Sequence, residues 1–119
     1  MGQGSLKNST LKNRILQLRD VLGNDRDFNT GHFLYLPKDQ EWDLNTKCAV
    51  ISESDVDGIP EFARKNGLSY ILGMAAIQDI GANAREQIKK VTLDTIFQAF
   101  LFYYKHDAFI NLKSDSPKS

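Results

Sequence analysis

The sequence predicts an α/β protein of the α+β kind, in which a small three-stranded sheet packs against helices in two layers. Three short apolar runs bounded by turn residues predict the strands. Three segments with apolar residues at three- and four-residue steps predict helices, and a segment between a proline and a glycine predicts a fourth. The 119 residues show no internal repeat and no dividing linker, so we expect a single domain, 1–119, with element order α-β-β-α-β-α-α.

The first half of the chain predicts one helix and two strands. From about residue 9 to residue 22, leucines and an isoleucine share one helical face, and Gly23 is a natural stop. The runs HFLYL (32–36) and KCAVI (47–51) predict strands, and the ten residues between them suit an antiparallel pair. The nearly continuous apolar character of KCAVI indicates a strand covered on both faces.

A short helix and a third strand follow. Pro60 suits the first position of the helix PEFARKN, and Gly67 suits its end. The run LSYILGM (68–74) predicts a strand. Because the connection from the strand at 47–51 is long enough for a crossover, the sequence favours a parallel pairing of these two strands.

Two helices close the chain. The first is expected at about 75–90, although Gly81 is unfavourable inside a helix. The second, a helix of roughly four turns, is expected in the stretch 92–110, with Thr92 as N-cap, and we predict that it is the central packing element. It holds six of the twelve aromatic residues: Phe97, Phe100, Phe102, Tyr103, Tyr104 and Phe109.

Composition points to an ordinary cytoplasmic protein. Fifteen Lys and Arg balance fifteen Asp and Glu, which argues against a general nucleic-acid or anionic-membrane binder. The single cysteine, Cys48, excludes an intrachain disulfide and fits a reducing compartment. The sequence shows neither a run of membrane-spanning length nor the apolar region of a signal peptide. We expect residues 1–8 and 112–119 to be flexible.

Catalytic and metal-binding motifs do not emerge from the sequence. Cys48 lies inside an apolar strand, where a thiol is expected to be buried and inert. The two histidines lack a partner motif and have no zinc-ligand spacing. The acidic run at 53–58 imitates the start of a calcium loop, but Arg64 stands where the closing glutamate belongs. The sequence therefore predicts a protein that is not an enzyme and holds no metal or cofactor.

Charge is unevenly placed. Between residues 39 and 61 there are seven acids and one base, Lys47, so this window carries minus six in a neutral chain. Such a window would steer a basic partner, with the tryptophan inside it as anchor. The alternative is that the acids only solvate loops and the tryptophan belongs to the core. The predicted partner-binding residues are Asp39, Glu41, Trp42, Asp43, Glu53, Asp55, Asp57 and Glu61.

Three stretches carry a family resemblance: YLPKDQEWDLNTKCAVI, PEFARKNGLSYILGMAAIQDI and AFLFYYKHDAFI. Over roughly residues 34–110 the chain resembles an uncharacterised family of small bacterial cytosolic proteins, whose shared motifs look structural. Such proteins look like the immunity proteins found beside contact-dependent or polymorphic toxins. The resemblance implies a non-enzymatic protein that binds and neutralises a cognate toxin.

The immunity hypothesis can be stated more closely, and one alternative belongs to another class. If the toxin is a nuclease with a basic site, the acidic window would block it, with Trp42, Tyr35 or Tyr70 as apolar anchors and no direct contact to nucleic acid or membrane. The alternative is a small-molecule-binding or enzymatic domain with a pocket beside the last helix, lined by Tyr103, Tyr104 and His106. A homodimer through the aromatic residues Phe102 and Tyr103 is compatible with both.

Overall fold

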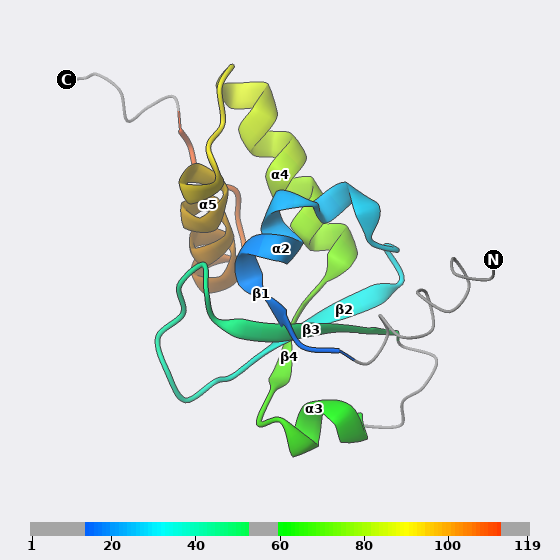
Figure 1. The fold of residues 1–119 in the computed structure, drawn as a ribbon. Coiled ribbons are helices and arrows are strands. Elements are labelled where there is room, and N and C mark those ends of the chain that lie inside the picture. The colour runs from blue at the N-terminus through cyan, green and yellow to red at the C-terminus, as the bar shows by residue number, and fades with distance from the viewer. Residues whose placement is uncertain (1–13, 53–59, 113–119) are drawn as a thin grey trace.

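The computed structural model describes residues 14–52 and 60–112, which form a four-stranded sheet with helices on both faces (Figure 1). The mixed α+β class predicted from the sequence is confirmed. In chain order the elements are β1 (Leu16–Gln17), α2 (Leu18–Gly23), the 3-10 helix η1 (Asp25–Asp27), β2 (His32–Leu36), β3 (Lys47–Ser52), α3 (Glu61–Lys65), β4 (Ser69–Gly73), α4 (Met74–Gln87) and α5 (Leu93–His106).

The sheet has the strand order β1-β3-β2-β4, and its neighbouring strands are antiparallel. The predicted antiparallel pair of β2 and β3 is confirmed, with Tyr35 opposite Ala49. β3 and β4 run parallel to each other, as predicted, because both are antiparallel to β2. They are not neighbours, however, since β2 lies between them and pairs with β4, Leu36 opposite Ser69. A crossover through α3 is long enough to pass β2, so its length alone does not fix which strand becomes the neighbour.

The fourth strand replaces part of the predicted first helix. Leu16 and Gln17 pair with Cys48 and Lys47, and the helix begins only at Leu18. Gln17 is extended, and its amide donates to the Asp20 carboxylate at 3.1 Å, which marks the start of α2. The predicted helix at 9–22 is therefore wrong at residues 16–17, where the edge of β3 competes with helical propensity, and residues 9–13 lie outside the described residues.

Both faces of the sheet are covered, as the apolar run of β3 predicts. Cys48 and Val50 belong to the larger core cluster with α2, α4 and α5, whereas Ala49 and Ile51 belong to a smaller cluster with Ala63 of α3. Figure 1 shows α3 below the sheet and the other labelled helices above it. The predicted two-layer arrangement is therefore incomplete, because α3 adds a small third layer.

Helix α3 ends at the glycine that the sequence indicates. Gly67 has φ of +70°, a backbone conformation that glycine adopts without strain. Its amide donates to Arg64 O at 3.2 Å, and the amide of Leu68 donates to Ala63 O at 2.9 Å. These two bonds form a Schellman motif, which satisfies the last carbonyls of the helix and turns the chain into β4.

Helix α5 packs against α2 and α4 and buries the fully inaccessible side chain of Phe100. The predicted N-cap is confirmed, because Thr92 Oγ1 accepts from the amide of Thr95 at 3.1 Å. The helix ends at His106 after 14 residues, which agrees with the predicted length of about four turns, because Asp107 adopts the left-handed conformation at φ of +56°. None of the described helices is long and apolar enough to cross a membrane.

Gly81 lies inside α4 where η1 approaches most closely. A Cβ atom at this position would lie 2.7 Å from the buried carboxylate oxygen of Asp25, which pairs with Arg85 at 3.4 Å. The cost of a glycine within the helix is therefore offset by room for this carboxylate.

We expect Gly81→Ala to lower the free energy of unfolding by about 1–3 kcal/mol, because the added methyl group overpacks the contact with η1. Urea denaturation followed by circular dichroism measures the change. At the neighbouring exposed position, Ala82→Gly should cost only about 1 kcal/mol through helix propensity. Stabilisation by Gly81→Ala, the usual result in a helix, would contradict the packing described here.

Candidate functional site

The loop between β2 and β3, residues 37–46, carries half of the predicted partner-binding residues. We call it the acidic loop. Its carboxylates at Asp39, Glu41 and Asp43 belong to exposed residues, and Lys38 is its one basic side chain, so three negative charges less one positive charge give minus two. The loop emerges on the side of the sheet nearest α5 (Figure 1).

Trp42 holds the acidic loop to the body of the protein. Its ring centroid lies 6.0 Å from that of Phe100 and 5.2 Å from that of Tyr104, both on α5. Its Nε1 atom donates to the carbonyl of Pro37 at 2.6 Å, so the loop closes around the indole. Trp42 is partly buried against the larger core. Trp42 therefore has the packing role that the sequence left as an alternative, and part of its side chain stays exposed.

The far end of the acidic loop is fixed by an Asx turn. The carboxylate of Asp43 accepts from the amide of Asn45 at 2.8 Å, and the amide of Asp43 donates to Thr46 Oγ1 at 2.7 Å. The Arg19 guanidinium of α2 donates to Asn45 Oδ1 at 3.1 and 2.8 Å. The backbone of Arg19 also donates to Leu44 O at 2.8 Å. Both ends of the loop are thus fastened, and its carboxylates are displayed from a defined backbone.

The other predicted residues are not brought to this loop. Glu53, Asp55 and Asp57 lie outside the described residues. Glu61 is exposed in the first turn of α3, on the opposite face of the sheet. The acidic loop joins the first residue of β3, Lys47, and the chain continues toward Glu61 after the last residue, Ser52. The two ends of this six-residue strand are about 20 Å apart. The expectation that the two acidic regions converge on one face therefore fails for Glu61.

The three predicted aromatic anchors differ in exposure. Tyr35 is 5% exposed, and burial, together with nearby Tyr70, raises its pKa. Tyr70 is 51% exposed, and its ring lies edge-on to Phe33 and Tyr35 on the α3 side of the sheet. Tyr104 is not among the predicted anchors, yet it is 37% exposed beside Trp42. It follows the buried Phe100 by one helical turn, so its sequence position alone does not indicate this exposure.

The residues of the predicted pocket beside α5 point to separate partners. Tyr103 stacks with Phe109 at 5.4 Å between ring centroids, and His106 stacks with Phe102 at 4.3 Å. Tyr104 contacts Trp42 instead. These contacts do not bring the three side chains together around one cavity. Within residues 14–52 and 60–112, no group of three or more His, Cys, Asp or Glu side chains is arranged to hold a metal ion.

Cys48 of β3 is fully buried in the larger core cluster, and burial, with a smaller effect from the charge of Asp20, raises the pKa of its thiol to about 12. We expect no reaction with a thiol reagent such as Ellman's reagent at pH 8 in the folded protein, and complete reaction in 6 M urea, because the thiolate is the reacting species. Because the folded-state pKa is raised, this group's contribution to stability is complete below about pH 9 and is lost as pH rises toward 12. Rapid labelling of the native protein would contradict the burial, and Cys48→Ala provides the blank.

Comparison with known proteins finds one family model, which covers almost the whole described chain. A family model described as a domain of unknown function (DUF7716) matches residues 15–112, from β1 through the segment after α5. Neither a curated protein nor a solved structure matches the sequence. The matched span includes both the acidic loop and the α5 helix against which it packs.

Proposed function

The chain belongs to the DUF7716 family, and we propose that it is a non-enzymatic immunity protein that binds and neutralises a cognate protein toxin. The proposed target is the nuclease domain at the C-terminus of a larger toxin, whose nucleic-acid site must be basic. The observation that carries the proposal is the acidic loop, whose exposed carboxylates are held on a fixed backbone by Trp42. A cytoplasmic location would place the protein where a nuclease toxin acts.

The fixed backbone of the loop matters for affinity and rate. Binding through a loop that is already ordered avoids part of the entropy cost of association. Asp39 and Glu41 are exposed, so their charges act over a distance and would raise the association rate with a basic protein. Asp43 shapes the turn and adds to the same negative field.

The proposal does not depend on the four predicted acids that lie outside the acidic loop. Glu53, Asp55 and Asp57 lie outside the described residues, and the same charge-reversal measurements test their contribution. Glu61 lies on the α3 side, so a partner centred on the acidic loop would gain little from direct contact with it.

Co-expression tests the proposal. The tagged chain is expressed with the reading frames that neighbour it in its source genome, and proteins that copurify in stoichiometric amount are identified by mass spectrometry. We expect the C-terminal fragment of a large toxin to copurify, to arrest growth when expressed alone, and to be harmless when the chain is present. If none of these frames is toxic, or if toxicity persists with the chain in excess, the immunity proposal is wrong.

A further inference from the structure

We infer that the centre of this binding surface is the ring pair formed by Trp42 and Tyr104, and that it receives an arginine side chain of the partner. The inference rests on the proposed function and specifies the chemistry of its partner. The two ring centroids lie 5.2 Å apart with an interplanar angle of 53°. Tyr104 is 37% exposed, whereas Phe100 behind the pair is completely buried.

The ring pair is rigid in the way that interface anchors require. Trp42 rests on Phe100 of the core, and its Nε1 hydrogen is donated to Pro37 O. Because this donor is already used, the indole offers a partner its π surface and not its N–H group. Tyr104 leans against the indole from α5. An aromatic surface fixed before binding loses little side-chain entropy when a partner arrives.

Charge complementarity selects a cation as the occupant. Glu41 and Asp43 are the chain neighbours of Trp42, with Cα atoms about 3.8 Å away along the chain. Asp39 follows two residues after Pro37, whose carbonyl holds the indole. The loop thus carries three exposed carboxylates within three residues of Trp42 along the chain, whereas the cations nearest in sequence are Lys38 in the loop and Lys105 beside Tyr104 on α5. Aromatic faces and carboxylates both attract cations, so the two features favour the same ligand.

Arginine fits this arrangement better than lysine. A guanidinium group is planar, so it can stack on a ring while its edge donates two hydrogen bonds to one carboxylate. Asp43 already accepts from Asn45 and Thr46, which leaves the exposed Asp39 and Glu41 as the acceptors for such a fork. A lysine ammonium would gain the charge attraction and lose the stacking.

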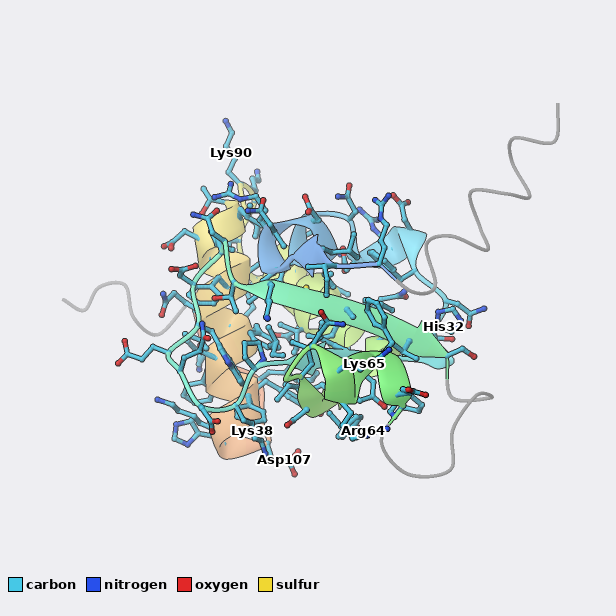
Figure 2. All side chains as sticks on the ribbon, turned by 60° about the horizontal axis from the view of Figure 1, so that its bottom comes forward. His32, Lys38, Arg64, Lys65, Lys90 and Asp107 are labelled. Carbon is cyan, nitrogen blue, oxygen red and sulfur yellow. The ribbon has the colours of Figure 1, made fainter. Side chains whose placement is uncertain are left out.

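The other strongly exposed tyrosine lacks this charge environment. Tyr70 lies on the α3 side of the sheet, where its ring contacts those of Phe33 and Tyr35 from the smaller core cluster. Figure 2 shows Arg64 and Lys65 on α3 over that face, so the nearest helix presents exposed cations there. Tyr70 therefore serves as a matched aromatic control and not as a second centre for a basic partner.

Fluorescence tests the inference, because Trp42 is the only tryptophan of the chain. The full chain is titrated at low salt with hexa-arginine, hexa-lysine and hexa-glutamate peptides while the Trp42 emission is recorded. We expect a saturable change with hexa-arginine, binding about fivefold weaker with hexa-lysine, and no change with hexa-glutamate. Tyr104→Leu, which keeps most of the apolar volume, should weaken hexa-arginine binding about tenfold, Tyr104→Phe should retain it, and Tyr70→Leu should leave it unchanged.

Three outcomes would overturn the inference: equal affinity for the arginine and lysine peptides, no saturable change with hexa-arginine, or unaltered binding by Tyr104→Leu. Urea denaturation of each variant establishes that it is folded, and Tyr104→Gln, which also removes the ring, carries the comparison if Tyr104→Leu is not. Failure of the proposed function is separate, because it is read from toxin neutralisation. If Tyr104→Leu neutralises the toxin as well as the wild type does, the proposed function stands and the inferred centre at Trp42 and Tyr104 is wrong. If the wild type binds hexa-arginine through Tyr104 but neutralises no toxin, the inferred centre stands and the proposed function is wrong.

Discussion

Replacing Phe100 by alanine is expected to lower the free energy of unfolding by about 4 kcal/mol, a typical cost for removing a buried phenylalanine. The side chain is completely inaccessible to solvent and belongs to the core that joins α2, α4 and α5 to the sheet. It also supports Trp42, so the cavity would loosen the acidic loop as well. A domain of this size is stable by about 5–15 kcal/mol, so the loss is a large part of the total. Urea denaturation followed by circular dichroism measures it.

Phe109 provides the matched control for this substitution. It is the same residue type, but it is 45% exposed and contacts Tyr103 at the surface. We expect Phe109→Ala to cost at most about 1 kcal/mol, because little apolar surface is returned to water. Equal losses at the two positions would show that Phe100 is not the central packing residue. With Phe100→Ala, the Trp42 emission of the folded protein should also move to longer wavelength.

Local signals in the sequence predict the ends of several elements correctly. Thr92 before an apolar stripe predicts the start of α5, and Asn66-Gly67 after a short helix predicts the end of α3. These signals work because a cap or a positive φ depends on one or two residues and their nearest backbone groups. The nearly continuous apolar run of β3 is also a local signal, because it requires only that the residues on both faces of the strand be apolar.

Tertiary pairing is not local, and here the sequence interpretation fails. A two-residue strand such as β1 contains too few residues for an alternating pattern, and its pairing depends on the free edge of β3. The position of β4 beside β2 depends on how the sheet assembles, with a register irregularity near Leu34 and Tyr35. The pairing of β1 with β3 and that of β4 with β2 therefore leave no periodic pattern of apolar residues in the sequence.

The candidate site shows the same division. Counting charges finds the acidic window, but a count along the chain cannot show that β3 separates its two halves. Trp42 is flanked by acids in the sequence, yet its ring points to Phe100 and Tyr104. A packing role and an acidic setting are thus compatible, because Glu41 and Asp43 are exposed while the indole between them is partly buried.

The motifs that carry the family resemblance have structural roles in this fold. Pro37 of the YLP motif accepts the hydrogen bond of Trp42, and Gln78 of the QDI motif donates to the carbonyls of Asp25 and Phe28. Asp107 of the DAFI motif ends α5 in the left-handed conformation. Specificity for a partner would then lie in the exposed residues between these motifs, Asp39 and Glu41 among them.

Reversing two exposed charges of the acidic loop, Asp39→Lys with Glu41→Lys, is expected to slow association with the copurified toxin fragment about 10- to 100-fold at low salt. The change removes two negative charges and adds two positive ones at a surface proposed to meet a basic site. Stopped-flow measurement of Trp42 emission gives the association rate at several salt concentrations. The difference from wild type should shrink as salt rises, because ions screen the long-range attraction.

Asp79→Lys with Glu86→Lys provides a control with the same change in net charge. Both residues are exposed on α4, away from the acidic loop, so their reversal tests whether total charge or its placement sets the rate. We expect the control to slow association by less than about threefold, since charges beyond a Debye length of the contact are largely screened. Equal slowing by the two double variants would make net charge sufficient, and the fixed display of the acidic loop by Trp42 would then have no part in capture. A slower rate for the loop variant alone would place the encounter at residues 39–41.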